Sequence, residues 1–154
     1  MTAAKSAPNN YRKKSAARLA AVQILYHIDI GKITSEEALK NFQENYLGKN
    51  IEEEAAVKPD IALMSKIVLG VQEKVADLDG MIRATLSDEW KLERMEKVIL
   101  AILRAGAYEL LACPETDTSI IISEYLDVTY AFYEDKEIKF VNAALNRLGQ
   151  TLRE

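Results

Sequence analysis

One stretch of the sequence, residues 97–113, constrains the fold more than any other. It reads K-V-I-L-A-I-L-R-A-G-A-Y-E-L-L-A-C, and its apolar residues cover every side of a helix of about 3.6 residues per turn. We therefore expect a buried central helix against which the other helices pack. Three polar side chains interrupt it, Arg104, Tyr108 and Glu109. Because a buried charge needs a partner, we expect Arg104 to be structural and to pair with Glu124 or another carboxylate on a neighbouring helix.

The rest of the chain contains further segments with apolar residues at helical spacing, separated by turn and capping residues. The β-branched run at residues 120–122 is the one place where a strand could be argued, but the sequence offers it no partner strand, so a helix is expected there too. The expected helices besides the central one cover residues 15–31, 34–48, 59–74, 78–86, 117–132 and 136–152, and a short segment with Trp90 leads into the central helix.

Composition limits the class of protein. The chain has 154 residues, 49% of them hydrophobic and only three of them proline, which suits one domain with an adequate core. No apolar run approaches the length of a membrane span and none follows a basic start, so we expect a cytoplasmic protein without a membrane segment. The single cysteine, Cys113, and the single histidine, His27, provide neither an internal disulfide nor a zinc cluster. We expect both in the core, and no metal or cofactor.

Charge is distributed unevenly along the chain. The net charge of −4 hides a basic beginning, because residues 1–28 include five basic side chains and no acidic one, whereas the remainder carries −9. A basic end on an acidic body can dock a phosphate backbone while the body faces a basic protein. The first residues are small and polar, so we expect residues 1–11 to form a flexible basic arm. The five basic residues are Lys5, Arg12, Lys13, Lys14 and Arg18.

The sequence shows no arrangement of residues that predicts catalysis. It has no glycine-rich phosphate loop and no paired nucleophile and base, and its carboxylate pairs lie in charged runs where solvated acids are expected. We therefore predict that the protein is not an enzyme.

Four separated motifs stand in a defined order along the chain. The first, A-A-R-L-A-A-V-Q-I-L-Y at residues 16–26, follows a basic cluster. Trp90, Leu92 and Arg94 form a W-x-L-x-R pattern, I-L-R and A-Y-E-L follow at 102–104 and 107–110, and K-F-V-N stands at 139–142. Together these motifs resemble the NusB family of bacterial transcription antitermination factors over nearly the whole folded length.

The resemblance implies an all-α fold of about seven helices in two packed helical subdomains around the buried central helix, with residues 12–154 as a single all-helical RNA-binding domain. It implies binding to the boxA element of nascent single-stranded RNA together with the ribosomal protein NusE. This activity belongs to antitermination in ribosomal RNA transcription, within the transcription elongation complex.

The same resemblance, read with the charge pattern, suggests the site residues. We expect phosphate contacts from Arg12, Lys13, Lys14 and Arg18, joined by Lys139 if the first and last helices lie side by side. Phe140 has two interpretations, a stacking surface for an unpaired base and plain core packing. Tyr26 is the candidate contact for NusE, which is expected to use part of the acidic surface.

The chain departs from the family pattern at three places. Ile99 and Leu100 stand where the family often has an acidic and then a basic residue. Ser123 precedes Glu124 where an asparagine is usual, and Ala143 replaces the glycine that usually follows K-F-V-N. A partner contact at the first position is therefore not carried over.

Two other interpretations stay open at this stage. One is a stand-alone relative of the NusB-like domain of ribosomal RNA methyltransferases, although the chain ends before a cofactor-binding fold could begin. The other is a structural or protein-binding helical module, whose basic end is ordinary solvated surface.

Overall fold

The computed structural model describes residues 2–49, 57–87 and 91–153, with the side chains of 2–9 and 46–49 excepted, and it is all-helical throughout these ranges. Trp90 lies outside the described residues. The described elements are α1 (Thr2–Gly31), α2 (Ser35–Lys49), α3 (Ile61–Thr85), the 3₁₀ turn η1 (Leu92–Arg94), α4 (Lys97–Ala112), α5 (Thr118–Tyr130) and α6 (Asp135–Leu152).

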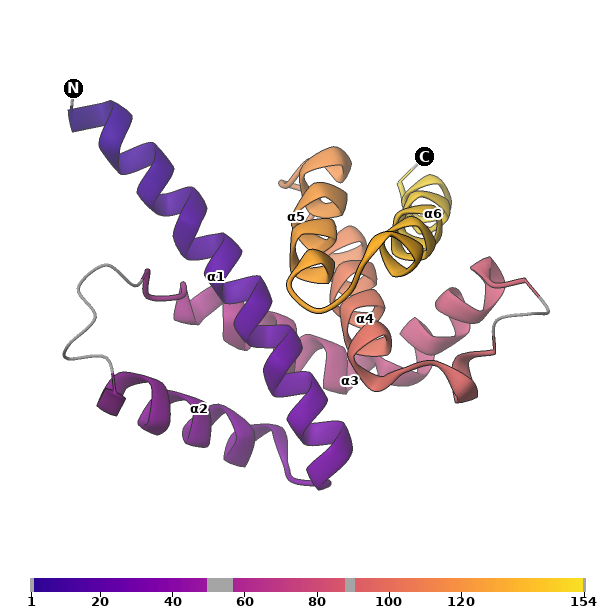
Figure 1. The fold of residues 1–154 in the computed structure, drawn as a ribbon, viewed down its shortest axis with the longest axis horizontal. Coiled ribbons are helices and arrows are strands. Elements are labelled where there is room, and N and C mark those ends of the chain that lie inside the picture. Colours follow the sequence, from indigo (N-terminus) through magenta and orange to yellow (C-terminus); the bar gives the residue numbers. More distant parts are fainter. Residues whose placement is uncertain (1, 50–56, 88–90, 154) are drawn as a thin grey trace.

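Helix α4 is the central helix that the sequence predicted. Most of its residues from Ile99 to Leu110 are buried, and α1, α3, α5 and α6 all pack against it. Helices α1, α2 and α3 pack on one another, and so do α4, α5 and α6 (Figure 1). The contacts of α4 with α1 and α3 join these two groups into one core.

Local capping chemistry sets the starts of α2 and α3. Thr34 Oγ1 accepts a hydrogen bond from the backbone N–H of Glu37 at 3.1 Å, and its hydroxyl donates to the Glu37 carboxylate at 3.2 Å. The Asp60 carboxylate accepts from the Leu63 N–H at 3.0 Å. Each side chain satisfies a backbone donor that the first turn of a helix leaves unpaired, as the sequence predicted.

Two helices are longer than predicted. The segments expected at 59–74 and 78–86 form one helix, α3, with a non-helical backbone (φ −110°, ψ 18°) at Lys74, the residue where the first segment was expected to end. Helix α1 begins at Thr2, whereas ordered structure was expected from about Tyr11. The flexible basic arm stays a prediction.

Polar side chains of the central helix find partners on neighbouring helices. Arg104 pairs with Asp79 of α3, because Nε and Nη2 donate to the two carboxylate oxygens at 2.8 Å each. The expected carboxylate on a neighbouring helix is therefore present, but the choice of Glu124 was wrong. Glu124 is occupied elsewhere.

Arg153 links the end of α6 to the end of α4. Its guanidinium donates to the backbone carbonyls of Glu109 at 3.2 Å, Leu110 at 2.9 Å and Cys113 at 2.6 Å. The last carbonyls of a helix have no partner within the helix, so Arg153 acts as a side-chain cap for α4. Cys113 itself is buried, as predicted.

Candidate nucleic-acid interface

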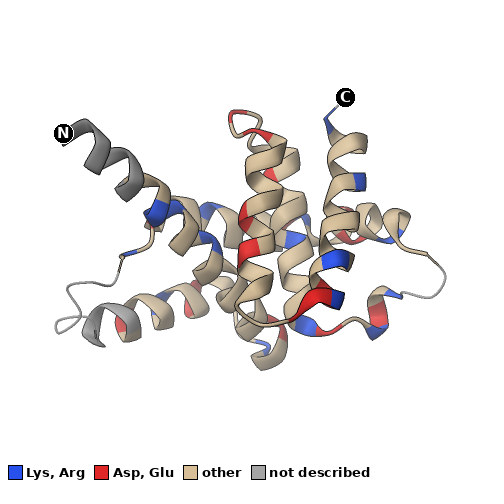
Figure 2. Cartoon of the chain, turned by 45° about the horizontal axis from the view of Figure 1, so that its top comes forward, with Lys and Arg blue, Asp and Glu red and all other residues tan. Residues whose placement is uncertain are grey.

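Three cations predicted from the sequence lie exposed on α1. Arg12, Lys13 and Lys14 are all solvent-exposed. Successive residues of an α-helix point about 100° apart, so these side chains fan out around the part of α1 that is not packed. Figure 2 shows blue Lys and Arg segments on α1 next to its grey N-terminal turns. This arrangement presents positive charge to solvent, as a phosphate-binding surface requires.

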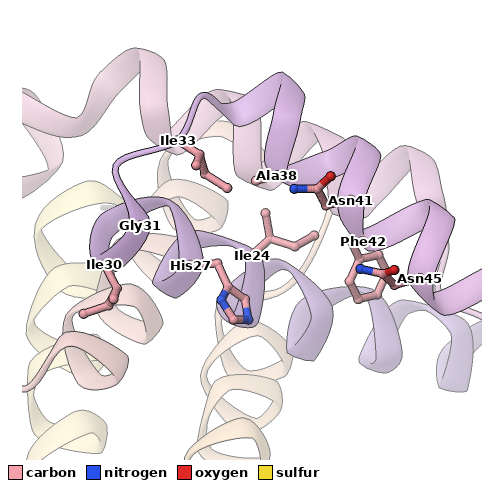
Figure 3. A pocket seen from close by; sticks show the side chains of 9 residues that line it. All are labelled: Ile24, His27, Ile30, Gly31, Ile33, Ala38, Asn41, Phe42 and Asn45. Atoms are coloured by element: carbon pink, nitrogen blue, oxygen red, sulfur yellow. The ribbon is translucent and has the colours of Figure 1, made fainter.

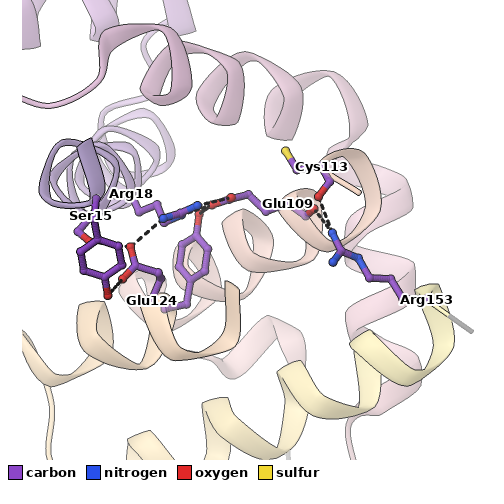
Figure 4. A network of polar contacts seen from close by, with 8 residues as sticks. Ser15, Arg18, Glu109, Cys113, Glu124 and Arg153 are labelled. Carbon is purple, nitrogen blue, oxygen red and sulfur yellow. Dashed lines mark hydrogen bonds and ion pairs between the residues drawn. The ribbon is translucent and has the colours of Figure 1, made fainter. Parts of the chain in front are cut away.

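Arg18, the fourth predicted cation, does not belong to that surface. It is only 3% exposed, and its side chain points between α4 and α5 (Figure 4). Its Nε and Nη2 donate to the two oxygens of Glu109 at 2.7 and 3.0 Å, while Nη1 donates to Glu124 at 2.7 Å. The prediction of a phosphate contact from Arg18 was wrong, because its guanidinium is buried and already donates hydrogen bonds to two carboxylates inside the protein.

The buried cluster around Arg18 has two carboxylates for one guanidinium. Burial lowers the pKa of Arg18, but the hydrogen bond and the charge of Glu109 outweigh it and raise the pKa overall. The Tyr125 hydroxyl donates to Glu109 at 2.5 Å. Burial first, and then the Glu109 charge, raise the pKa of Tyr125 well above its ordinary value, so this tyrosine stays a neutral donor.

Glu124 receives two more hydrogen bonds from α1. The Tyr11 hydroxyl donates to Oε2 and the Ser15 hydroxyl to Oε1, each at 2.7 Å. The hydrogen bond from Tyr11 to Glu124 raises the pKa of Tyr11 above its usual range. Among the described residues, no buried side-chain nitrogen or oxygen lacks a hydrogen-bond partner. The excess carboxylate is therefore stabilised by neutral hydroxyl donors.

Lys139 and Phe140 lie on a different side of the molecule from the α1 cations. Helix α6 packs on α3, α4 and α5, and Figures 1 and 2 both show α4 and α5 between it and α1. The condition under which Lys139 would join the α1 cluster is therefore not met. Lys139 is exposed, whereas Phe140 is partly buried against the core.

Phe140 takes part in a second cationic surface that sequence reasoning missed. A pocket of about 310 Å³ between η1, α4 and α6 is lined by Phe140 together with Lys91, Arg94 and Lys136, and also by two acids, Glu96 and Glu137. The signal was present in the sequence, because Arg94 belongs to the W-x-L-x-R motif. We call the exposed residues Lys91, Arg94, Lys136 and Lys139 with Phe140 the α6 surface.

Tyr26 lines a surface pocket rather than the core. The pocket, of about 440 Å³, includes Tyr26, His27, Phe42 and Phe132, from three different helices or their ends. The Tyr26 ring meets the His27 ring edge-on at 5.8 Å between centroids. His27 is exposed, so its predicted place in the core was wrong; the apolar side of α1 passes through Ile24, Leu25 and Ile28 and leaves position 27 at its edge.

A larger groove lies between α1 and α2. Figure 3 shows Ile24, Ala38 and Phe42 facing one another across it, with Asn41 and Asn45 from α2 beside them. Its volume is about 570 Å³. His27 and Phe42 line both this groove and the Tyr26 pocket, so the two hollows adjoin.

The described residues contain no group of three His, Cys, Asp or Glu side chains arranged to hold a metal ion. Within the same ranges, each helix is too short or too polar to cross a membrane. The described structure is a small all-helical protein with a buried ion-pair cluster around Arg18. It also has an exposed cationic turn on α1 and a second group of cations beside the Phe140 ring. These features define a compact all-helical protein with two exposed clusters of cations.

Comparison with known proteins gives the family. The NusB family model matches residues 15–150. The transcription antitermination protein NusB of Novosphingobium aromaticivorans is 39% identical over 92% of this chain and 96% of its own length, and that of Maricaulis maris is 39% identical over 99% and 96%. The chain belongs to the NusB family.

Solved structures share the fold. A NusB from T. maritima superposes with a TM-score of 0.74 at 22% identity, covering 89% of this chain and 90% of that one. A NusB solved with NusE in complex with double-stranded RNA gives a TM-score of 0.74 at 25% identity, covering 92% of this chain and 98% of that one. The predicted all-α fold, with about seven helices in two groups around a buried central helix, is confirmed.

Proposed function

We propose that this protein is an RNA-binding transcription antitermination factor that binds boxA-type single-stranded RNA together with the ribosomal protein NusE during ribosomal RNA transcription. The observation that carries the proposal is the likeness to a NusB solved with NusE and RNA, which extends over 92% of this chain. Curated relatives at 39% identity bear the name of antitermination proteins. The chain acts by binding in the cytoplasm, within the transcription elongation complex, and catalyses no reaction.

The exposed α1 cations are our candidates for the phosphate contacts. Arg12, Lys13 and Lys14 support this role because they are exposed and adjacent. Neutralising phosphates releases counterions, so their contribution depends strongly on salt. Arg18 is not part of the proposal, since it is committed to Glu109 and Glu124.

The α6 surface is a second candidate for RNA contact. Lys139 is exposed, and Phe140 is partly buried beside a pocket that Lys91 and Arg94 also line. An aromatic ring next to cations suits an unpaired base whose phosphate is neutralised nearby. Because this surface and the α1 cations lie on different sides, charge removal on each should act independently.

NusE is expected at the Tyr26 pocket. Tyr26 is only partly exposed, and it shares the hollow with Phe42 and Phe132, which gives an apolar depression at the surface. Interfaces concentrate their binding energy in aromatic anchors that fill such depressions. The net negative charge of the chain after residue 28 would attract a basic ribosomal protein.

The test is a titration of labelled boxA-type RNA and a shuffled RNA of equal length, each with and without NusE, at two salt concentrations. We expect preference for boxA, tighter binding with NusE, and weaker binding at higher salt. Equal affinity for both RNAs with no effect of NusE would contradict the proposal. It would favour the second candidate, a protein-binding helical module, for which the apolar groove between α1 and α2 is the supporting observation.

A further inference from the structure

The cationic turn of α1 is bracketed by two hydroxyls that reach the same carboxylate. Tyr11 and Ser15 are four residues apart and therefore lie on one side of α1, one turn from each other. Each donates to a different oxygen of Glu124 at 2.7 Å. Arg12, Lys13 and Lys14, between them in sequence, are exposed. The hydroxyls thus hold one side of the turn on α5 while its charges face solvent.

Glu124 is a firm anchor for these bonds. Its side chain is 2% exposed, and Arg18 holds it at 2.7 Å from the next turn of α1. Hydrogen bonds to an ionised, buried acceptor are among the stronger ones in proteins. Tyr11 is 52% exposed as a residue, and its hydroxyl hydrogen bond to Glu124 is the polar side-chain contact that ties it to α5.

A second tether reaches the same turn from another helix. The backbone N–H of Asp60, the N-cap residue of α3, donates to the Lys13 carbonyl at 3.0 Å. The turn is therefore held by α5 on one side through side chains and by the start of α3 through the backbone. A helical turn that is held in this way cannot unwind without losing several hydrogen bonds.

We propose that Tyr11 and Ser15 are positioning residues for RNA binding, which fasten the α1 turn to Glu124 so that Arg12, Lys13 and Lys14 meet RNA as a preformed cluster. This inference rests on the proposed function. A segment that is ordered before binding does not pay the entropy of ordering when the RNA arrives, and this raises affinity without any new contact. Neither hydroxyl touches RNA in this mechanism.

The experiment compares Tyr11→Phe, Ser15→Ala and the double variant with the wild-type chain. Tyr130→Phe with Ser123→Ala is the matched control, because it removes the same two hydroxyl types from exposed positions of α5. Ser15→Thr keeps a hydroxyl and should bind RNA like the wild type. Two quantities are measured: amide hydrogen exchange over residues 11–16 in the free protein, and the salt dependence of the Kd for labelled boxA-type RNA.

We expect faster exchange over residues 11–16 in the double variant and a Kd raised by roughly three- to tenfold. The slope of log Kd against log salt should stay at the wild-type value, because every cation is still present. The control should change neither quantity. Circular dichroism and the exchange of α4 amides confirm that the body remains folded.

Three results would overturn the inference. Unchanged exchange over residues 11–16 would show that the hydroxyls do not hold the turn. Faster exchange with an unchanged Kd would show that preforming the turn is irrelevant to binding. A reduced salt slope would mean that the substitutions remove phosphate contacts directly. Failure of the proposed function gives a different result. If the wild-type chain binds no boxA-type RNA, the proposed function is wrong, whatever the amide exchange of the variants shows.

Discussion

Arg18 and Glu109 form a two-pronged ion pair at the centre of the molecule, between a helix near the beginning of the chain and the buried central helix. The Arg18 side chain is 4% exposed and the Glu109 side chain 1%. Such a pair adds little net stability to the fold, because the cost of removing both charges from water is about as large as their mutual attraction. Removing only one partner is costly, because the other charge is then left buried and unpaired.

Replacing Arg18 alone should strongly destabilise the fold. Arg18→Met leaves Glu109 and Glu124 buried with no cation, and we expect the free energy of unfolding to fall by about 3–5 kcal/mol in a urea melt. Arg83→Met is the control, because the Arg83–Glu93 pair is more than half exposed and should matter far less. A stable Arg18→Met variant that no longer binds RNA would return Arg18 to the binding surface.

Removing the exposed α1 cations should weaken RNA binding without unfolding the protein. In the triple variant Arg12→Gln, Lys13→Gln, Lys14→Gln, each lost phosphate contact should flatten the log–log salt dependence by about 0.7 for single-stranded RNA. The control neutralises three exposed lysines on other parts of the surface, Lys32, Lys40 and Lys66. If both variants bind with the wild-type slope, the phosphate contacts lie elsewhere, and the α6 surface becomes the first place to look.

Gly70 should tolerate no side chain, although it sits in the middle of a helix. A Cβ there would lie 2.2 Å from Cζ of Tyr108, inside the van der Waals contact of two carbons. We expect Gly70→Ala to lower the free energy of unfolding by about 1–3 kcal/mol, because the buried ring must shift. Gly80→Ala on the same helix meets nothing within 4 Å and should be neutral or slightly stabilising. Equal melting temperatures for the two variants would show that the ring moves freely.

Alkaline pH should destabilise the protein through its tyrosines. Burial, with the charge of Glu109 next, raises the pKa of Tyr125 well above 10.0, and burial near Glu96 raises that of Tyr133 to about 12. A pKa that is higher in the folded state contributes stability below the unfolded value, and that contribution is lost as pH rises past about 10 toward the folded value. Urea midpoints measured between pH 8 and 11 should fall above pH 10. Tyr125→Phe should make that fall shallower, and an unaltered profile would contradict the assignment.

Tyr26→Asp should reduce co-purification with NusE and leave RNA binding by the protein alone intact. A charge in the apolar Tyr26 pocket must lose its hydration when a partner covers it. Leu111→Asp introduces the same charge at an exposed apolar position of α4 and serves as the control. If Tyr26→Asp retains NusE as well as the control does, Tyr26 belongs to packing.

The sequence predicted the central helix closely because its apolar residues cover every side, and the helix starts at Thr34 and Asp60 because their capping chemistry is local. The sequence could not predict that Arg18 is buried and paired with two carboxylates. Arg18 stands one turn after Lys14 and therefore resembles a continuation of the basic face, while its partners lie 91 and 106 residues away. The sequence marks Glu109 as a charge on the apolar central helix and Glu124 as a candidate partner for Arg104, but assigning both carboxylates to Arg18 requires the packing of three helices.

Those separations also set an order of events during synthesis. Arg18 leaves the ribosome long before Glu109 and Glu124, which lie 91 and 106 residues further along the chain. Contacts between residues so far apart form late, because the intervening chain must first be made and then brought together. Until α4 and α5 have both emerged, a guanidinium buried at this site would lack one or both of its carboxylates, so we expect α1 to reach its final position only after α5 is made. We therefore expect the charged turn of α1, although it is made first, to be fixed in place only after α5 has been made.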